Sequence, residues 1–156
     1  MDVEKIVREN IDRIIHLSLA TSVDNKPWVC ELHFAYDEGL NLYWRSLKSR
    51  RHSQEIMINQ TVAGNIIDKH ALNDEVVGLY FEGGAELIAP GAMQDLAAEC
   101  LADRLKMSKK DILDEAKDEN GHQFYKITVE NWYIFGKFGA ENGQKLKLKW
   151  KGNHEF

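Results

Sequence analysis

Four cationic side chains crowd into the segment YWRSLKSRRH, residues 43–52, of a chain whose formal net charge is −5. They are Arg45, Lys48, Arg50 and Arg51. An apolar strand pattern leads into the segment and a helix pattern leads out of it. The cations therefore fall at the amino end of a helix, where the helix dipole already disfavours positive charge. Repeated cations at such a place indicate an anionic ligand, most simply a phosphate, which Arg50 and Arg51 would bind with paired N–H groups.

Three uncharged polar residues of the same segment would add hydrogen bonds to the anion: Ser46, Ser49 and His52. The alternative is a solvated basic turn whose cations pair with some of the 25 acidic residues of the chain. Spacing alone leaves both readings open, because the segment lacks the glycine-rich cradle of a P-loop.

Hydrophobic spacing predicts the elements that hold this segment. A helical pattern covers residues 3–13. Alternation then predicts three strands, which short turns join into an antiparallel meander, over residues 14–22, 28–37 and 40–46. The pattern of residues 50–59 predicts a helix directly after the cationic turn.

The rest of the chain returns to strands, with two more helices inserted. Strands are expected over 61–68, 75–89, 122–136 and 145–150, and helices over 92–105 and 108–117. The pair Gly83-Gly84 suggests a bulge or sharp bend. We expect a single domain over residues 1–156, of the α+β class. Its core would be a mainly antiparallel six- to seven-stranded split β-barrel with flanking helices.

Composition narrows the classes of function. The acidic net charge argues against nucleic-acid binding and against an anionic membrane surface as partner. Cys30 and Cys100 lie too far apart for a typical metal site, and we expect free thiols. No apolar run approaches the roughly 20 residues that span a bilayer, and the charged amino-terminal segment lacks an apolar signal core. We expect a cytoplasmic protein.

The order of the motifs from Leu17 to Glu86 resembles the FMN-binding split-barrel family typified by pyridoxamine 5′-phosphate oxidase. A strand ending in LAT is followed by a turn with Pro27, a second strand, a DEG hairpin and an aromatic-ended strand. A Ser-Arg-Arg turn, a helix and the later strand LYFEGGAELI complete the order. The resemblance implies a homodimer that holds FMN in clefts between the subunits. It also implies an oxidoreductase that acts on a small-molecule substrate or electron donor.

The resemblance assigns roles to particular positions. Arg50 and Arg51 match the phosphate-binding pair, Trp44 and Arg45 match positions beside the flavin, and the strand from Trp28 to His33 would run along the ring. With the polar residues of the turn, the expected cofactor-binding residues are Trp28, Val29, Cys30, Glu31, His33, Trp44, Arg45, Ser46, Lys48, Ser49, Arg50, Arg51 and His52. No catalytic side chain is assigned, because the flavin itself carries the redox chemistry.

Three departures from the oxidase argue against pyridoxamine phosphate as substrate. Gly78 stands where the oxidase has a flavin-contacting Gln, Trp28 stands where it has Arg, and its C-terminal substrate segment is missing. Two alternatives therefore stay open. One is a flavin-binding or redox-responsive protein without catalysis. The other is a haem-binding or haem-degrading relative, with His154 as the candidate axial ligand.

Overall fold

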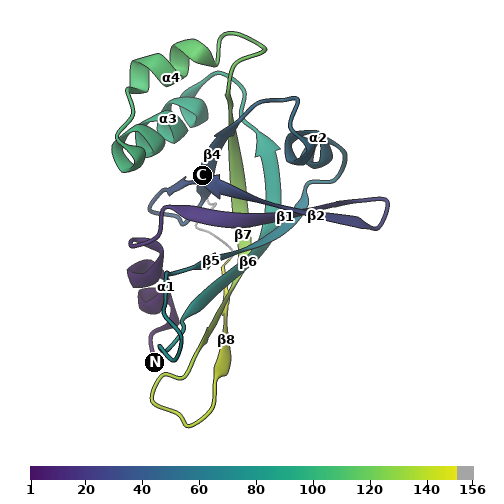
Figure 1. The fold of residues 1–156 in the computed structure, drawn as a ribbon. Helices are drawn as coiled ribbons and strands as arrows, with labels where there is room; N and C mark the ends of the chain where they lie inside the picture. Colours follow the sequence, from purple (N-terminus) through teal and green to yellow (C-terminus); the bar gives the residue numbers. More distant parts are fainter. Residues whose placement is uncertain (151–156) are drawn as a thin grey trace.

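The computed structural model describes residues 1–150, in which eight strands form one curled sheet with four helices around it (Figure 1). The helices are α1 (Val3–Ile11), α2 (Arg51–Ile58), α3 (Ala92–Leu105) and α4 (Lys109–Glu115). The strands are β1 (His16–Val23), β2 (Lys26–His33), β3 (Ala35–Tyr36), β4 (Leu42–Ser46), β5 (Thr61–Ile67), β6 (Gly78–Leu87), β7 (Gln123–Gly136) and β8 (Gln144–Lys149).

The sheet is antiparallel throughout and runs in the order β2-β1-β5-β6-β7-β4-β3. The 14-residue strand β7 is the longest strand and pairs with three others. One edge of β7 pairs with β6, whereas the other pairs first with β4 and then, from Asn131 to Gly136, with β8. This topology places β4, and therefore the cationic turn that follows it, near one end of the curled sheet.

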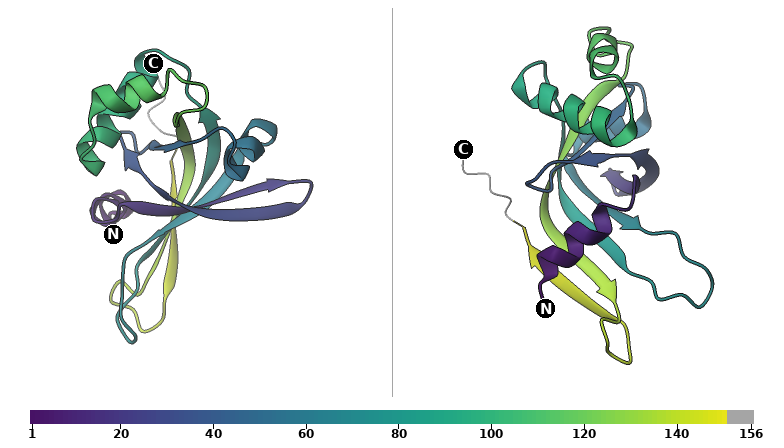
Figure 2. Two further views of the ribbon diagram at one scale, coloured as in Figure 1. Left: turned by 45° about the horizontal axis from the view of Figure 1, so that its top comes forward. Right: turned by 90° about the vertical axis from the view of Figure 1, so that its left-hand side faces the viewer.

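The strand expected over residues 28–37 is in fact two strands. β2 pairs with β1 at one edge of the sheet, whereas β3 pairs with β4 at the opposite edge. The consecutive residues Phe34 and Ala35 are both fully buried, which breaks the alternation, and the chain crosses between the edges there (Figure 2). The expected meander is therefore wrong. The α+β split-barrel class is confirmed, with eight strands in the described part of the chain rather than six or seven.

Large aromatic side chains fill the inside of the curl. Trp44 stacks on Tyr125 with ring centroids 5.2 Å apart, and Phe81 meets Trp132 edge to face at 5.8 Å. The apolar face of α1, including Ile11, closes this core. Burial of such side chains is the main stabilising contribution to a domain of this size.

Local chemistry explains the turns. Asp24 and Asn25 both have positive φ, 53° and 60°, in the two-residue turn between β1 and β2, as such hairpins require. The sheet register shifts between Glu82 and Gly83, where a Cβ on Gly83 would lie 2.1 Å from the carbonyl oxygen of Thr128. The expected irregularity at the glycine pair is thus confirmed.

Helices α3 and α4 pack together beyond one end of the sheet (Figures 1 and 2). Ser108 caps α4 by accepting a hydrogen bond from the backbone N–H of Asp111. A second, smaller core joins α3 to β3, β4 and β7. None of the helices in residues 1–150 is both long and apolar enough to cross a membrane.

Candidate functional site

The cationic turn lies between β4 and α2, as the sequence predicts. β4 ends at Ser46 and α2 begins at Arg51, with Arg50 as the N-cap in an extended conformation, φ −67° and ψ 146°. No side chain caps α2, and its first turn holds no acidic residue. The start of this helix therefore offers backbone N–H groups and two arginines without the usual internal anion.

Two of the expected polar ligands face each other instead of solvent. The Oγ of Ser46 lies 2.7 Å from Nε2 of His52, and both side chains are buried. Burial, and then the charge of Arg50, lower the pKa of His52 below its ordinary value. The imidazole is therefore neutral near pH 7 and joins β4 to α2 rather than adding charge to the turn.

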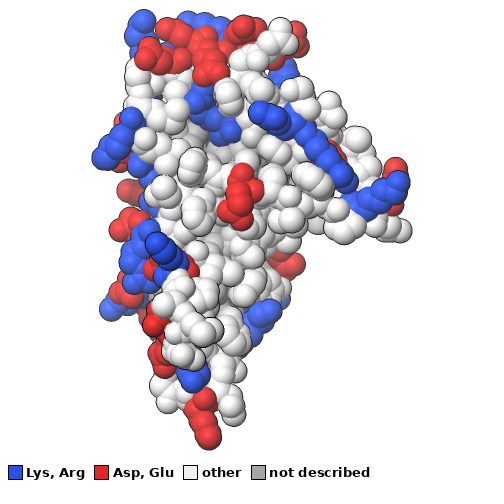
Figure 3. All heavy atoms as spheres, in the orientation of Figure 1, with Lys and Arg blue, Asp and Glu red and all other residues white. Residues whose placement is uncertain are grey.

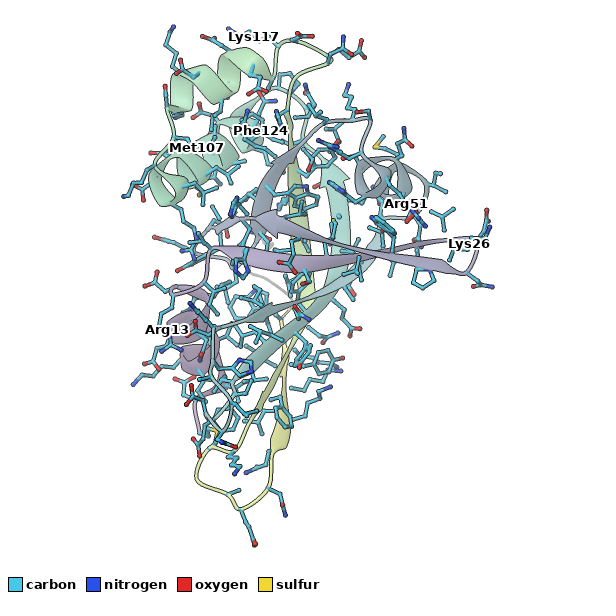
Figure 4. All side chains as sticks on the ribbon, viewed as in Figure 1. Arg13, Lys26, Arg51, Met107, Lys117 and Phe124 are labelled. Atoms are coloured by element: carbon cyan, nitrogen blue, oxygen red, sulfur yellow. The ribbon has the colours of Figure 1, made fainter. Side chains whose placement is uncertain are left out.

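Arg51 is held on two sides. Its Nε donates to Glu55 Oε2 at 3.1 Å, and its guanidinium carbon lies 4.3 Å from the ring centre of Trp28 on β2. Glu55 in turn accepts a hydrogen bond of 2.9 Å from Thr21 on β1. Figure 4 shows Arg51 beside the β1–β2 hairpin, which carries Lys26 at its tip. The start of α2 is thus built from residues of three elements.

Arg45 and Lys48 form ion pairs with acidic residues at and just after the end of α4. Arg45 pairs with Glu115 at the end of α4 and lies 5.9 Å from the ring centre of Phe124. A hydrogen bond from His122, together with the Arg45 cation, lowers the pKa of Glu115 to about 2 against the opposing effect of burial. Lys48 Nζ lies 3.5 Å from a Glu119 carboxylate oxygen.

The alternative reading, a basic turn that pairs with acids, is therefore correct for three of the four cations. Arg45, Lys48 and Arg51 each have a carboxylate partner. Arg50 has none within residues 1–150 and its side chain is exposed. The uncompensated charge of the turn thus comes from Arg50, directly at the start of α2.

The expected flavin-side residues fall into two groups. Val29, Glu31 and His33 are exposed on β2, and Trp28 is 41% exposed. Trp44, in contrast, is fully buried against Tyr125. Its side chain has no surface to offer a ligand, contrary to expectation, because the indole points into the main core.

The remaining two expected residues, Ser49 and Cys30, differ in their exposure to solvent. Ser49 is exposed in the turn. Cys30 is half-buried, and burial, followed by the neighbouring Glu31 carboxylate, raises the pKa of its thiol to about 11. It is therefore a neutral thiol, and Cys30 and Cys100 are both free.

The face formed by β1 and β2 is poor in charge. Figure 3 shows that charged side chains gather over α1, α2 and the α3–α4 pair and are sparse over the strands between them. One of the few charged groups there, Glu31, accepts a hydrogen bond from Ser18 and lies 3.6 Å from His16. β2 is a terminal strand of the sheet, so within residues 1–150 its outer edge carries backbone groups without a strand partner.

Sequence reasoning missed the carboxylates around the turn. The i,i+4 spacing of Arg51 and Glu55 is a signal that would have found Glu55. Glu115 and Glu119 carried no such signal, because about 70 residues separate them from the turn. His154, the candidate haem ligand, lies outside the described residues. Within residues 1–150, no group of three or more His, Cys, Asp or Glu side chains is arranged to hold a metal ion.

No protein-family model and no curated protein matches the sequence, but many solved structures match the fold. HutZ, the heme storage protein from Vibrio cholerae, is 17% identical with a TM-score of 0.72, covering 91% of this chain and 100% of that protein. A heme-binding protein from Mycobacterium smegmatis is 15% identical with a TM-score of 0.66, and the match covers 90% of this chain and 57% of that one. An FAD-binding protein from Mesorhizobium loti is 19% identical with a TM-score of 0.62, covering 83% and 89%. These similarities establish the split-barrel fold.

Proposed function

We propose that the chain binds FMN, with the phosphate at the start of α2, and acts as an oxidoreductase on a small molecule. The observation that carries the proposal is Arg50, an exposed cation without a carboxylate partner in residues 1–150, at the N-cap of a helix with no acid in its first turn. Arg51 lies next to it with its terminal N–H groups free of acceptors in the same residues. Together they form a phosphate site of two guanidinium groups and backbone amides.

The flavin ring would lie along β2, from Trp28 to His33. The outer edge of this terminal strand has backbone N–H groups to donate to the polar edge of the ring. Such donors stabilise the negative charge that the ring acquires on reduction. The bound flavin would supply the electron transfer, and the residues of the chain would bind and orient it. The alternative is the same site without turnover, in a flavin-binding or redox-responsive protein.

We further propose that the protein is a homodimer and that the flavin lies between the copies. Four large apolar side chains of β2 and α2 are exposed: Trp28, Val29, Met57 and Ile58, the last being 73% exposed. A second copy that covers them would remove apolar surface from water and would also enclose the ring.

A haem-binding function is the second candidate. It is favoured by the names of two proteins with the same fold, HutZ and the Mycobacterium smegmatis protein. An axial ligand would be required, and His33 on the exposed face of β2 and His154 are the candidates. Loss of a haem Soret band in either His→Ala variant would support this candidate.

A comparison of FMN with riboflavin, which lacks the phosphate, tests the proposed function. We expect Arg50→Ala to weaken FMN binding by about tenfold or more, because a charge-assisted hydrogen bond is lost, and to leave riboflavin binding unchanged. Lys137→Ala, which removes an exposed cation from a distant loop, serves as the control. Equal FMN affinity of Arg50→Ala and the wild type would contradict the phosphate site.

A further inference from the structure

Arg51 belongs to a chain of contacts that crosses three elements. Thr21 Oγ1 on β1 donates to Glu55 Oε1 at 2.9 Å, and Arg51 Nε donates to the other carboxylate oxygen at 3.1 Å. The indole of Trp28, from β2, lies under the guanidinium at 4.3 Å. Each member fixes the next one, so the orientation of Arg51 is set by β1 and β2 as well as by its own helix.

The contacts leave one edge of the guanidinium free. Glu55 occupies the Nε–H, and Trp28 covers one face of the plane. No acceptor within residues 1–150 takes the N–H groups of the two terminal nitrogens. A guanidinium held in this way presents a preorganised pair of donors, which matches two oxygens of a phosphate group.

The position of Glu55 is unusual for an anion site. Its side chain is 11% exposed, and a carboxylate so close to the proposed phosphate opposes anion binding through its charge. Burial also opposes its ionisation, yet the hydrogen bonds from Arg51 and Thr21 outweigh burial and lower its pKa. Glu55 is therefore a permanent anion near neutral pH, and its charge cannot be what favours a phosphate here.

We propose that Glu55, supported by Thr21 and Trp28, is a positioning residue that orients Arg51 toward a phosphomonoester group at the start of α2. This inference rests on the proposed function and names the residues that shape its phosphate site. Glu55 then has two opposite effects on phosphate binding. Its acceptor oxygens orient Arg51 and so strengthen phosphate binding, whereas its negative charge repels the phosphate and weakens binding.

Two substitutions separate geometry from charge. Glu55→Gln keeps an acceptor oxygen and removes the charge, so we expect it to bind FMN at least as tightly as the wild type. Glu55→Ala removes both, and we expect about tenfold weaker FMN binding, the effect of one misplaced charge-assisted hydrogen bond. Riboflavin affinity should be the same in all forms. Gln54→Ala, an exposed position of the same helix, controls for effects on α2 itself.

The double variant Glu55→Ala with Arg51→Ala tests whether Glu55 acts through Arg51. We expect it to bind FMN within about twofold of Arg51→Ala alone, because coupled residues are not additive. Additive losses, or Glu55→Ala binding FMN as tightly as Glu55→Gln, would overturn the inference. If Glu55→Ala does not fold, as judged by circular dichroism, Thr21→Val replaces it with a smaller loss of FMN affinity in the same direction, and an unchanged affinity would then overturn the inference.

A measurement without flavin keeps the two proposals apart. In ¹⁵N NMR spectra, the Arg51 Nε–H should exchange slowly in the wild type, fast in Glu55→Ala, which lacks its acceptor, and at an intermediate rate in Thr21→Val, which keeps the acceptor but loosens it. Wild-type protein that binds no FMN would contradict the proposed function, but the exchange rates would still test whether Glu55 positions Arg51. Equal Nε–H exchange in the wild type and the variants would overturn the inference that Glu55 positions Arg51.

Discussion

Ser46 Oγ lies 2.7 Å from His52 Nε2, and this buried contact joins the last residue of β4 to the first turn of α2. It fixes where the helix begins relative to the sheet. Arg50 and Arg51, the proposed phosphate ligands, lie on either side of that starting point. The contact therefore connects the stability of the fold with the geometry of the site.

The first expectation concerns this contact. His52→Ala leaves the buried Ser46 hydroxyl without its partner and opens a cavity, so the free energy of unfolding should fall by about 2–3 kcal/mol. Urea unfolding followed by tryptophan fluorescence measures the change. His70→Ala, at an exposed loop position, should change the free energy by less than about 0.5 kcal/mol. Equal stability of the two variants would show that the contact contributes nothing.

The second expectation is that the free energy of unfolding depends on pH in the acid range because of Glu115. A carboxyl whose pKa is lowered by folding stabilises the folded state above the unfolded pKa, and that contribution is lost as the pH falls through the folded pKa. For Glu115 the window runs from about 4.5 down to about 2. The side chain is 41% exposed, so solvent screening limits the contribution to about 1 kcal/mol.

Glu115→Gln tests this acid dependence. The variant should be less stable than the wild type at pH 7, and the difference should shrink as the pH falls from 4.5 toward 2. Glu119→Gln, which removes the exposed partner of Lys48, is the matched control and should follow the wild-type pH profile. A constant difference between Glu115→Gln and the wild type over this range would exclude Glu115 as the source.

The third expectation uses the two adjacent glycines of β6. A Cβ on Gly83 would lie 2.1 Å from the Thr128 carbonyl oxygen, whereas a Cβ on Gly84 would meet no atom within 4 Å. Gly83→Ala must displace β7 and should destabilise the fold by about 3 kcal/mol or more. Gly84→Ala should change the midpoint of thermal unfolding little. Similar unfolding temperatures for the two variants would mean that the close approach of β6 and β7 at the bulge is not needed.

The fourth expectation concerns the proposed dimer. Val29 is 61% exposed on β2, and a carboxylate there would have to be desolvated by a covering second copy. Val29→Glu should therefore shift the protein from dimer to monomer in light scattering. Leu72→Glu, in the loop before β6 where Leu72 is 91% exposed, should leave the mass unchanged. A Val29→Glu variant that stays dimeric would exclude this face as the contact surface.

Local patterns predicted much of the fold. The helix over residues 50–59 and the irregularity at Gly83 could both be predicted from the sequence, because each depends on residues a few positions apart. The crossing of the chain between the sheet edges at Phe34 and Ala35 could not be predicted from the sequence. It follows from the pairing of β3 with β4 and β2 with β1, which only the closed sheet determines.

The same division holds for the candidate site. The cations at the start of α2 were visible as a local oddity of charge, and their position between β4 and α2 is confirmed. Their carboxylate partners Glu115 and Glu119 lie about 70 residues further along the chain. The burial of Trp44 depends on its stacking against Tyr125. Contacts of that range leave no periodic signal in a sequence.

The most direct measurement for the central claim is a titration of the purified protein with FMN and, separately, with haemin. Flavin fluorescence and visible absorbance report the binding of each ligand. We expect FMN to bind in the micromolar range or tighter, with a lower affinity in Arg50→Ala, and we expect no sharp Soret band with haemin. No FMN binding together with a sharp Soret band would contradict the proposed FMN site and would support haem binding instead.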